Sequence, residues 1–364
     1  MNKFDGATLL GERAMLSGYR VPGLVSAGGG CRLYRSRTGL IALNLARPGD
    51  RELLPALFET ESTACCTDAT LAALIAASDA QRLVARGRIL GLAIAAERQS
   101  APLNPACKLL TLALPVSPSR APAPRVLDLS ALWAGPLAAH LLWLAGAEVI
   151  KVESRGRPGA LGVGEADFFA LLNQGKASLE MDLRQTDDRS ALLSLIAGSD
   201  IVIEAARPRA LLQLGIDADT IVGATPGLTW LTITAHGAQG EAANWVGFGD
   251  DCGVAAGLTA ALRGVTGCPG FVGDAIADPL TGILAAGIAW DGWSSGKGGR
   301  FGLTMSGVVA EAIAEARSQD SIGFDRSLVQ WAAAKGSPFG FVKRRAIGPV
   351  SPQDADMGAH RSSC

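Results

Sequence analysis

The chain has 364 residues, of which 48% are hydrophobic and 18% charged, and its formal net charge is −1. This balance is typical of a folded protein with a large core and excludes a disordered chain. The near-neutral charge and the aromatic content of only 5% argue against nucleic acid as a partner.

Cysteine, histidine and hydropathy patterns exclude further classes. Seven cysteines without a CxxC pair and three scattered histidines predict neither a disulfide framework nor a metal centre. The longest apolar run, 131–147, is shorter than a membrane span of roughly 20 residues. The first residues do not resemble a signal peptide, so we expect no membrane partner and a cytoplasmic location.

A proline-rich stretch, PVSPSRAPAP at 115–124, is the clearest linker in the chain. It predicts a small N-terminal lobe at 1–114 and a large domain at 125–364. The large domain begins with a strand at 125–130, a helix at 134–147 and a strand at 148–153, and further strands follow near 201–206 and 227–235. This alternation predicts an α/β fold with an open, mostly parallel, doubly wound (Rossmann-like) sheet, plus a smaller α/β lobe.

Ligands of such sheets bind at the carboxyl ends of strands, which makes the turn at 130–136 a candidate site. That turn lacks GxGxxG, and the chain lacks GxxxxGK[ST], which argues against dinucleotide and P-loop enzymes. The stretch GWSSG at 292–296 matches a hydrolase nucleophile elbow, but it follows a helical segment where a strand is required. We interpret it as a turn.

Five motifs in one order resemble family III CoA-transferases. They are VLDLSALWAGPLAAHLLWLAGAEVIKVESRGRPG, NQGKASLEMDLR, DIVIEAARPRALLQLGI, TPGLTWLTITAHGAQG and DAIADPLTGILAAGIAW, between residues 126 and 290. That superfamily includes formyl-CoA and carnitine CoA-transferases and α-methylacyl-CoA racemase. The resemblance implies coenzyme A as a substrate, no permanently bound cofactor, and a carboxylic acid as acceptor.

The order of the domains departs from the family pattern. The family places a small domain before its C-terminal end, whereas here the N-terminal lobe, with SAGGGCRLYRSRTGLIALNLARPGD, resembles that part. A small domain moved to the front is the simplest account, and a lobe of independent origin is the alternative. Gln174 stands where the family has Arg.

Asp274 and Asp278 precede an apolar helix, and the resemblance implies that Asp278 is the catalytic nucleophile. A carboxylate can form an anhydride with an acyl group, as CoA transfer between acids requires. We interpret Asp274 as a helix cap or turn residue, because helix starts favour acidic side chains.

Binding residues are expected in four places. The turn at Leu132, Trp133, Ala134 and Gly135 offers helix N-terminal amides to phosphates, and Arg155 and Arg157 could pair with them. The triple glycine Gly28, Gly29 and Gly30 could bring backbone N–H groups to an oxyanion. Arg207 and Arg209 are further candidates for phosphates, and Lys151 is expected to be an ordinary charge at a strand end.

Two alternatives stay open. One is a racemase or epimerase of 2-methylacyl-CoA, which needs a second acid/base group; Phe248 stands where the racemase branch has His, and Asp250 or Asp251 could substitute. The other is an inactive acyl-CoA-binding protein. Because family III enzymes are dimers and the small-residue helices are apolar on most sides, we also expect a homodimer.

Overall fold

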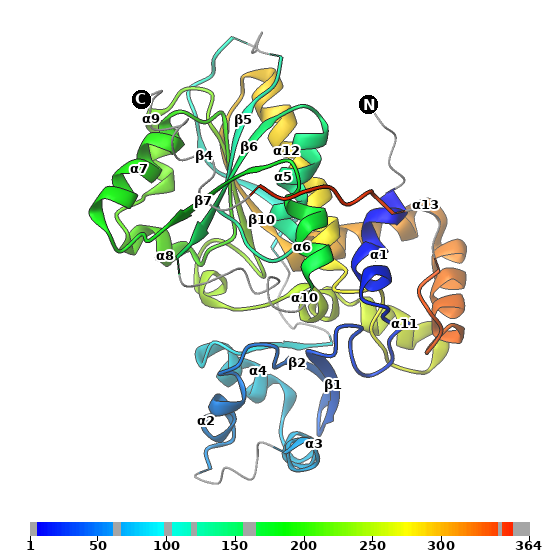
Figure 1. The fold of residues 1–364 in the computed structure, drawn as a ribbon. Coiled ribbons are helices and arrows are strands. Elements are labelled where there is room, and N and C mark those ends of the chain that lie inside the picture. The colour runs from blue at the N-terminus through cyan, green and yellow to red at the C-terminus, as the bar shows by residue number, and fades with distance from the viewer. Residues whose placement is uncertain are drawn as a thin grey trace.

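The computed structural model describes residues 6–60, 67–97, 104–117, 122–155, 165–340 and 344–351. It contains a seven-stranded sheet in a large body and a three-stranded sheet in a small lobe beneath it (Figure 1). The α/β prediction with a mostly parallel sheet and a smaller lobe is confirmed.

The large sheet has the strand order β4-β10-β9-β8-β5-β6-β7. All neighbours run parallel except β4, which pairs antiparallel with β10. The strands are β4 (Cys107–Leu112), β5 (Arg125–Asp128), β6 (Glu148–Ser154), β7 (Ala177–Met181), β8 (Ile201–Glu204), β9 (Thr229–Thr234) and β10 (Gly299–Thr304).

Helices cover both faces of this sheet, and alternate strand residues serve the two layers. Val126 and Ile203 pack in the same core cluster as residues of α5 (Ala134–Leu144), α12 (Ala277–Ser295) and α13 (Met305–Ala333). Leu127 and Val202 pack towards the opposite layer of α7 (Thr186–Ala197), α8 (Pro208–Gln213) and α9 (Ala218–Ala224). The central strands are therefore buried on both sides, as their continuous apolar runs require.

The small lobe is an antiparallel sheet of β1 (Cys31–Ser36), β2 (Gly39–Asn44) and β3 (Ala93–Ala96), packed by α2 (Leu54–Phe58), α3 (Asp68–Ala77) and α4 (Ala80–Ile89). It has its own core, which includes Ile41, Leu43, Ile75, Leu83 and Ile94. The side chains of Thr67 and Asp79 cap α3 and α4 by accepting backbone N–H groups. Glu97, directly after β3, accepts two hydrogen bonds from Arg263 of α11 (Leu258–Thr266), from Nε at 2.8 Å and from Nη2 at 2.6 Å. This ion pair connects the lobe to the body.

Two segments before the linker contact the body. The strand β4 pairs with β10, and α1 (Gly6–Leu16) packs against α12 and α6 (Ala166–Asn173). From the sequence we expected both segments in the lobe at 1–114. Local sequence patterns predict helices and strands, but they do not show which distant elements these pack against. The division at 115–124 stays a prediction, and residues 118–121 lie outside the described part.

The GWSSG stretch forms the end of α12 and the Gly296 cap behind it, so it is not a nucleophile elbow. Helix α13 consists of two helical segments that meet at Asp320. No helix in the described ranges is long and apolar enough to cross a membrane.

Candidate active site

A cavity of about 220 Å³ lies where the strand order of the large sheet reverses. From β5 the chain continues outward to β6 and β7, and then returns to β8, β9 and β10 on the other side of β5. Such a switch point is where doubly wound sheets bind ligands. Most of the lining comes from the residues at and after the carboxyl ends of β5, β8 and β9, from the segment 243–248 and from the starts of α5, α12 and α13, and Arg47 comes from the small lobe. The lining residues are Arg47, Ala131, Leu132, Ala134, Gly135, Ala205, Ala206, Arg207, Ile233, Thr234, Ala235, Ala243, Trp245, Val246, Gly247, Phe248, Asp278 and Met305.

Asp278, the second residue of α12, is half-buried and lines this cavity. Burial raises its pKa to about 7, and Asp250 adds to the rise, whereas Arg13 and the backbone N–H groups of Ala134 and Gly249, which bond to the carboxylate, oppose it. A carboxyl group that titrates near neutrality can act both as a nucleophile and as a leaving group.

Two glycines allow other elements to approach Asp278 closely. A side-chain carbon at Gly249, the first residue of α10 (Gly249–Ala255), would overlap Asp278 Oδ2 and the carbonyl oxygen of Ala275. A side-chain carbon at Gly282 would lie 2.7 Å from the carbonyl oxygen of Ala134. Gly282, four residues after Asp278, therefore lets α12 pack against the start of α5.

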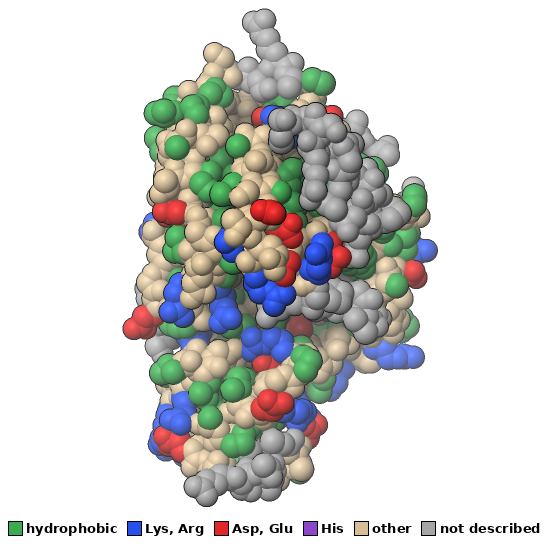
Figure 2. Space-filling view, turned by 60° about the vertical axis from the view of Figure 1, so that its left-hand side comes forward, with side chains coloured by type: hydrophobic (Ala, Val, Ile, Leu, Met, Phe, Trp, Pro, Cys, Tyr) green, Lys and Arg blue, Asp and Glu red, His purple; other side chains and the backbone are tan. Residues whose placement is uncertain are grey.

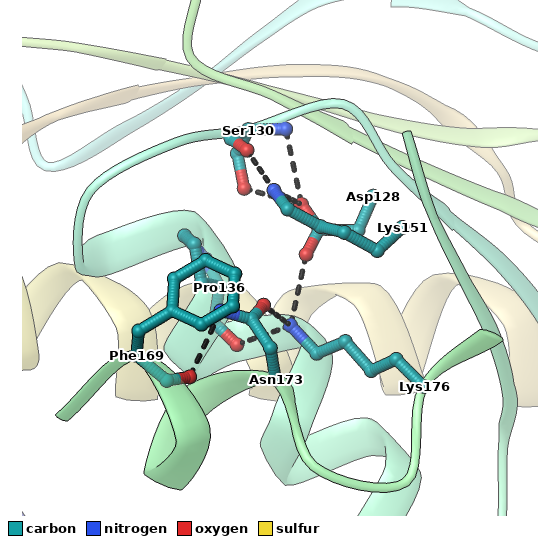
Figure 3. Close-up of polar contacts among 7 residues, drawn as sticks. All are labelled: Asp128, Ser130, Pro136, Lys151, Phe169, Asn173 and Lys176. Atoms are coloured by element: carbon teal, nitrogen blue, oxygen red, sulfur yellow. Dashed lines mark hydrogen bonds and ion pairs between the residues drawn. The ribbon is translucent and has the colours of Figure 1, made fainter. Parts of the chain in front are cut away.

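A buried charge network holds the turn that follows β5 (Figure 3). Lys176 Nζ donates to Asp128 Oδ2 at 2.9 Å and to the carbonyl oxygen of Pro136 at 3.0 Å. Lys151 lies 3.6 Å from Asp128 Oδ1 and donates to the carbonyl oxygen of Ser130. Burial would raise the pKa of Asp128, but Lys151 and Lys176 outweigh it and hold that pKa at about 2. Lys151 is thus a buried partner of Asp128, which corrects the prediction of an ordinary strand-end charge.

The turn itself brings the predicted residues to the cavity. Leu132, Ala134 and Gly135 line it, and Leu132 adopts φ of 67°, a conformation that side chains other than glycine rarely adopt. Trp133 is buried and packs beneath the guanidinium of Arg13, whose carbon lies 4.9 Å from the ring centroid.

The glycines at 28–30 and Arg155 lie away from the cavity lining, whereas Arg207 is part of it. Gly28 lies beside Arg13, since a side-chain carbon there would be 3.3 Å from Arg13 Nη2. Gly29 and Gly30 continue this turn into β1. Arg155 is exposed directly after β6, and Arg157 lies outside the described residues.

Asp274 is not a cap. It is fully buried, and its two carboxylate oxygens accept from Arg13 Nε at 2.9 Å and from Arg13 Nη2. The N-cap of α12 is Ile276, without a side-chain bond. Sequence reasoning missed Arg13 because its partner is 261 positions away.

A second hollow continues from the cavity. It has a volume of about 640 Å³ and shares Arg207 and Trp245 with the first, and it adds Arg88 and Arg209. Figure 2 shows Lys and Arg side chains gathered near the level where lobe and body meet. The guanidinium carbon of Arg88 lies 3.9 Å from the Trp245 ring centroid. The stretch ARPR indicated Arg207 and Arg209, but no local pattern marked Arg88 or Trp245.

Behind Gly247, the side chains of His236, Asp251 and Cys252 come together with ligand atoms within 4.8 Å of one another. Burial raises the pKa of Asp251 to about 8 and lowers that of His236 to about 3. The positive charge of Arg88 acts on all three groups. Because the Arg88 guanidinium already places a cation beside this cluster, we assign no metal to it.

Comparison with known proteins places this chain in a family. The sequence model of CoA-transferase family III matches residues 124–306, half of the chain. The chain belongs to that family.

Among its relatives is a probable fatty acyl-CoA transferase of Mycobacterium tuberculosis, 32% identical over 170 residues, or 44% of this chain and 43% of that protein. Another is the succinyl-CoA–D-citramalate CoA-transferase of Chloroflexus aurantiacus, 32% identical over 186 residues, or 47% and 45% of the two chains. A crystal structure of the M. tuberculosis protein is 28% identical with a TM-score of 0.49, covering 56% of this chain and 58% of that one. The matches span under half the length of these two curated relatives.

Proposed function

We propose that this protein transfers CoA between an acyl-CoA thioester and a carboxylic acid, with Asp278 as the nucleophile. The observation that carries this proposal is the Asp278 carboxylate at the switch-point cavity, held by the N–H groups of Ala134 and Gly249. Among the described residues that line the cavity, Asp278 is the one carboxylate. A racemase would need a second acid/base group there, so transfer is the better supported reaction.

Asp278 attacks the thioester carbonyl, which forms a mixed anhydride and releases the CoA thiolate. The thiolate attacks the aspartyl carbonyl, so the first acid leaves and an aspartyl-CoA thioester remains. The acceptor carboxylate then attacks the carbonyl of this thioester, which forms a second anhydride and releases the CoA thiolate again. The thiolate attacks the acyl carbonyl of that anhydride, so the new acyl-CoA forms and the Asp278 carboxylate is regenerated. In the steps at the aspartyl carbonyl, the oxyanion develops on the oxygen that faces Ala134 and Gly249, whose N–H groups can stabilise it.

CoA would extend from the cavity into the neighbouring hollow. Arg207 and Trp245 line both spaces, so the pantetheine arm would pass them on its way to Asp278. Arg207 and Arg209 would pair with phosphates. Leu132, Ala134 and Gly135 would line the thioester end, and Arg155, Arg157 and the glycines at 28–30 remain proposed contributors.

Mass spectrometry of the full chain, before and after proteolysis, tests this proposal. The protein is incubated with a panel that includes succinyl-CoA and fatty acyl-CoA, because relatives are named for these donors. We expect a CoA adduct on the Asp278 peptide, absent in Asp278→Asn. Asp291 is an exposed carboxylate on the same helix. Asp291→Asn is therefore the matched control and should still form the adduct.

Other outcomes identify the alternatives. CoA binding without adduct or transfer across the panel would indicate an acyl-CoA-binding protein. Exchange of the α-proton of a 2-methylacyl-CoA in D₂O, without an adduct, would indicate a racemase. Full transfer by Asp278→Asn would contradict the proposed nucleophile.

A further inference from the structure

The loop before the nucleophile is held by contacts on both sides. Arg13 binds both oxygens of Asp274. The next residue, Ala275, donates its N–H to Asp250 Oδ1 at 3.1 Å and accepts the N–H of Asp278 at 2.9 Å. Ala275 adopts φ of 41°, a strained conformation that persists only where surrounding contacts fix it.

Arg13 also contacts the second segment that holds Asp278. Its guanidinium covers Trp133, and the neighbouring residue Ala134 offers its N–H to the Asp278 carboxylate. Gly28 and Tyr19 close the other side, with the Tyr19 ring centroid 5.8 Å from the guanidinium carbon. One side chain from α1 therefore joins the 273–278 loop to the turn after β5.

We propose that Arg13 is a positioning residue for the transfer reaction: anchored on Asp274 and stacked on Trp133, it fixes the Asp278 carboxylate against its N–H donors and favours its ionised form. This rests on the proposed function, because it assumes that Asp278 reacts as a carboxylate. The two parts of the role, geometry and charge, can be separated by substitution.

The charge part has a definite sign. Arg13 is the largest influence that lowers the pKa of Asp278 against burial. Arg13→Met therefore raises that pKa above about 7. Asp274→Asn removes the countercharge of Arg13, so the guanidinium acts more strongly on Asp278 and the pKa of Asp278 falls. The ionisable groups that act on Asp278 or Arg13 are Tyr19, Glu165, Asp250, Asp251, Cys252 and Asp274, and Arg47 and Arg207 line the cavity that Asp278 faces.

A purely structural role makes a different prediction. Both Arg13→Met and Asp274→Asn break the same buried ion pair, and loss of one partner leaves the other uncompensated. If the pair served stability alone, both variants would lose stability and neither would move the pH dependence of Asp278. Opposite shifts of the pH dependence are therefore the signature of the proposed role.

The test measures the single-turnover rate of adduct formation against pH for wild type, Arg13→Met, Arg13→Lys and Asp274→Asn. We expect the midpoint to move up by about one pH unit in Arg13→Met, which is about tenfold in rate below the midpoint, and to move down in Asp274→Asn. Arg13→Lys keeps the positive charge but loses the bidentate contact with Asp274. The midpoint of its pH profile should therefore equal that of wild type, and its maximal rate should fall at least tenfold. Arg20→Met removes an exposed arginine that donates to the carbonyl oxygen of Gly336 and should match wild type.

A second measurement does not need turnover. NMR titration of protein labelled with ¹³C at the aspartate carboxyl carbons, with the Asp278 signal identified by its loss in Asp278→Asn, reports the pKa directly. If wild type forms no adduct, the proposed function fails and this titration still decides the charge part. Shifts in the same direction in Arg13→Met and Asp274→Asn, or no shift in either, would overturn the inference. Should Arg13→Met not fold, Arg13→Lys and Asp274→Asn decide: a displaced midpoint in the first or an unmoved one in the second overturns it.

Discussion

At the residue scale, Asp278 combines a reactive role with a cost to stability. Its pKa of about 7 in the folded protein exceeds the value of about 3.9 for an unfolded Asp. A raised pKa stabilises the folded state below the unfolded value, and this contribution is lost as the pH rises through 7. The ionised carboxylate therefore destabilises the protein above neutral pH.

Asp278→Asn should reveal this cost. Because Asn carries no charge at any pH, we expect its gain in unfolding free energy over wild type to be larger at pH 8 than at pH 5 by about 1–3 kcal/mol. Chemical denaturation at the two pH values measures it, with the exposed Asp291→Asn as control. Equal gains at both pH values would show that Asp278 is not titrating between them.

Sequence reasoning indicated Asp278 but misread its neighbours. The motif and its place before an apolar helix marked the carboxylate, and the turn at 132–135 followed from the strand-to-helix grammar. The cap role for Asp274 and the ordinary strand-end charge for Lys151 were wrong because their partners, Arg13 and Asp128, come from other elements. A local pattern contains no record of such contacts.

At the element scale, backbone proximity places Asp278 against α10 and α5. Gly249 is the sharpest case, since a side-chain carbon there would overlap both Asp278 Oδ2 and the Ala275 carbonyl oxygen. Gly249→Ala must displace the carboxylate or shift the start of α10. A displacement of about 1 Å can cost a hundredfold in rate, so we expect at least a hundredfold loss of adduct formation.

Gly264→Ala is the matched control for Gly249→Ala. Gly264 lies within α11, and a side-chain carbon there meets nothing within 4 Å. Alanine is the better helix former by roughly 0.5–1 kcal/mol, so this variant should keep its activity and unfold at slightly higher denaturant concentration. Comparable adduct rates in both variants would contradict the proposed approach of α10 to Asp278.

Most helices and strands could be predicted from the sequence, but which of them pack together could not. Buried parallel strands and the helices between them follow from apolar runs with turn residues at their ends. The position of β4 does not, because an edge strand needs only one partner and its sequence does not say which. The same holds for α1, whose mixed faces meet α6 and α12.

At the scale of the whole molecule, α1 connects the segment 344–351 to the site. Glu12 and Arg13 are neighbours on this helix: Arg13 reaches Asp274, and Glu12 accepts three side-chain hydrogen bonds and one backbone N–H from Arg345. Gln174 donates to the carbonyl oxygen of Ala346 at 2.9 Å, which gives this departure from the family motif a structural role. The homodimer that the sequence indicates stays a prediction.

The Glu12–Arg345 pair is therefore expected to carry much of the attachment of residues 344–351. Both side chains are almost fully buried, at 1% and 3% exposed. Removing one charge leaves the other buried without compensation, at a cost of about 3–5 kcal/mol. Glu12→Gln should lower the unfolding free energy by an amount in this range, measured by denaturant titration at pH 7. Glu59, which pairs with Arg82 and Arg86 at the surface of the lobe with half of its side chain exposed, supplies the control: exposed pairs contribute about 0–1 kcal/mol, so Glu59→Gln should change little. A loss below about 1 kcal/mol in Glu12→Gln would mean that the C-terminal segment is held by its backbone contacts, and that α1 acts on the site through Arg13 alone.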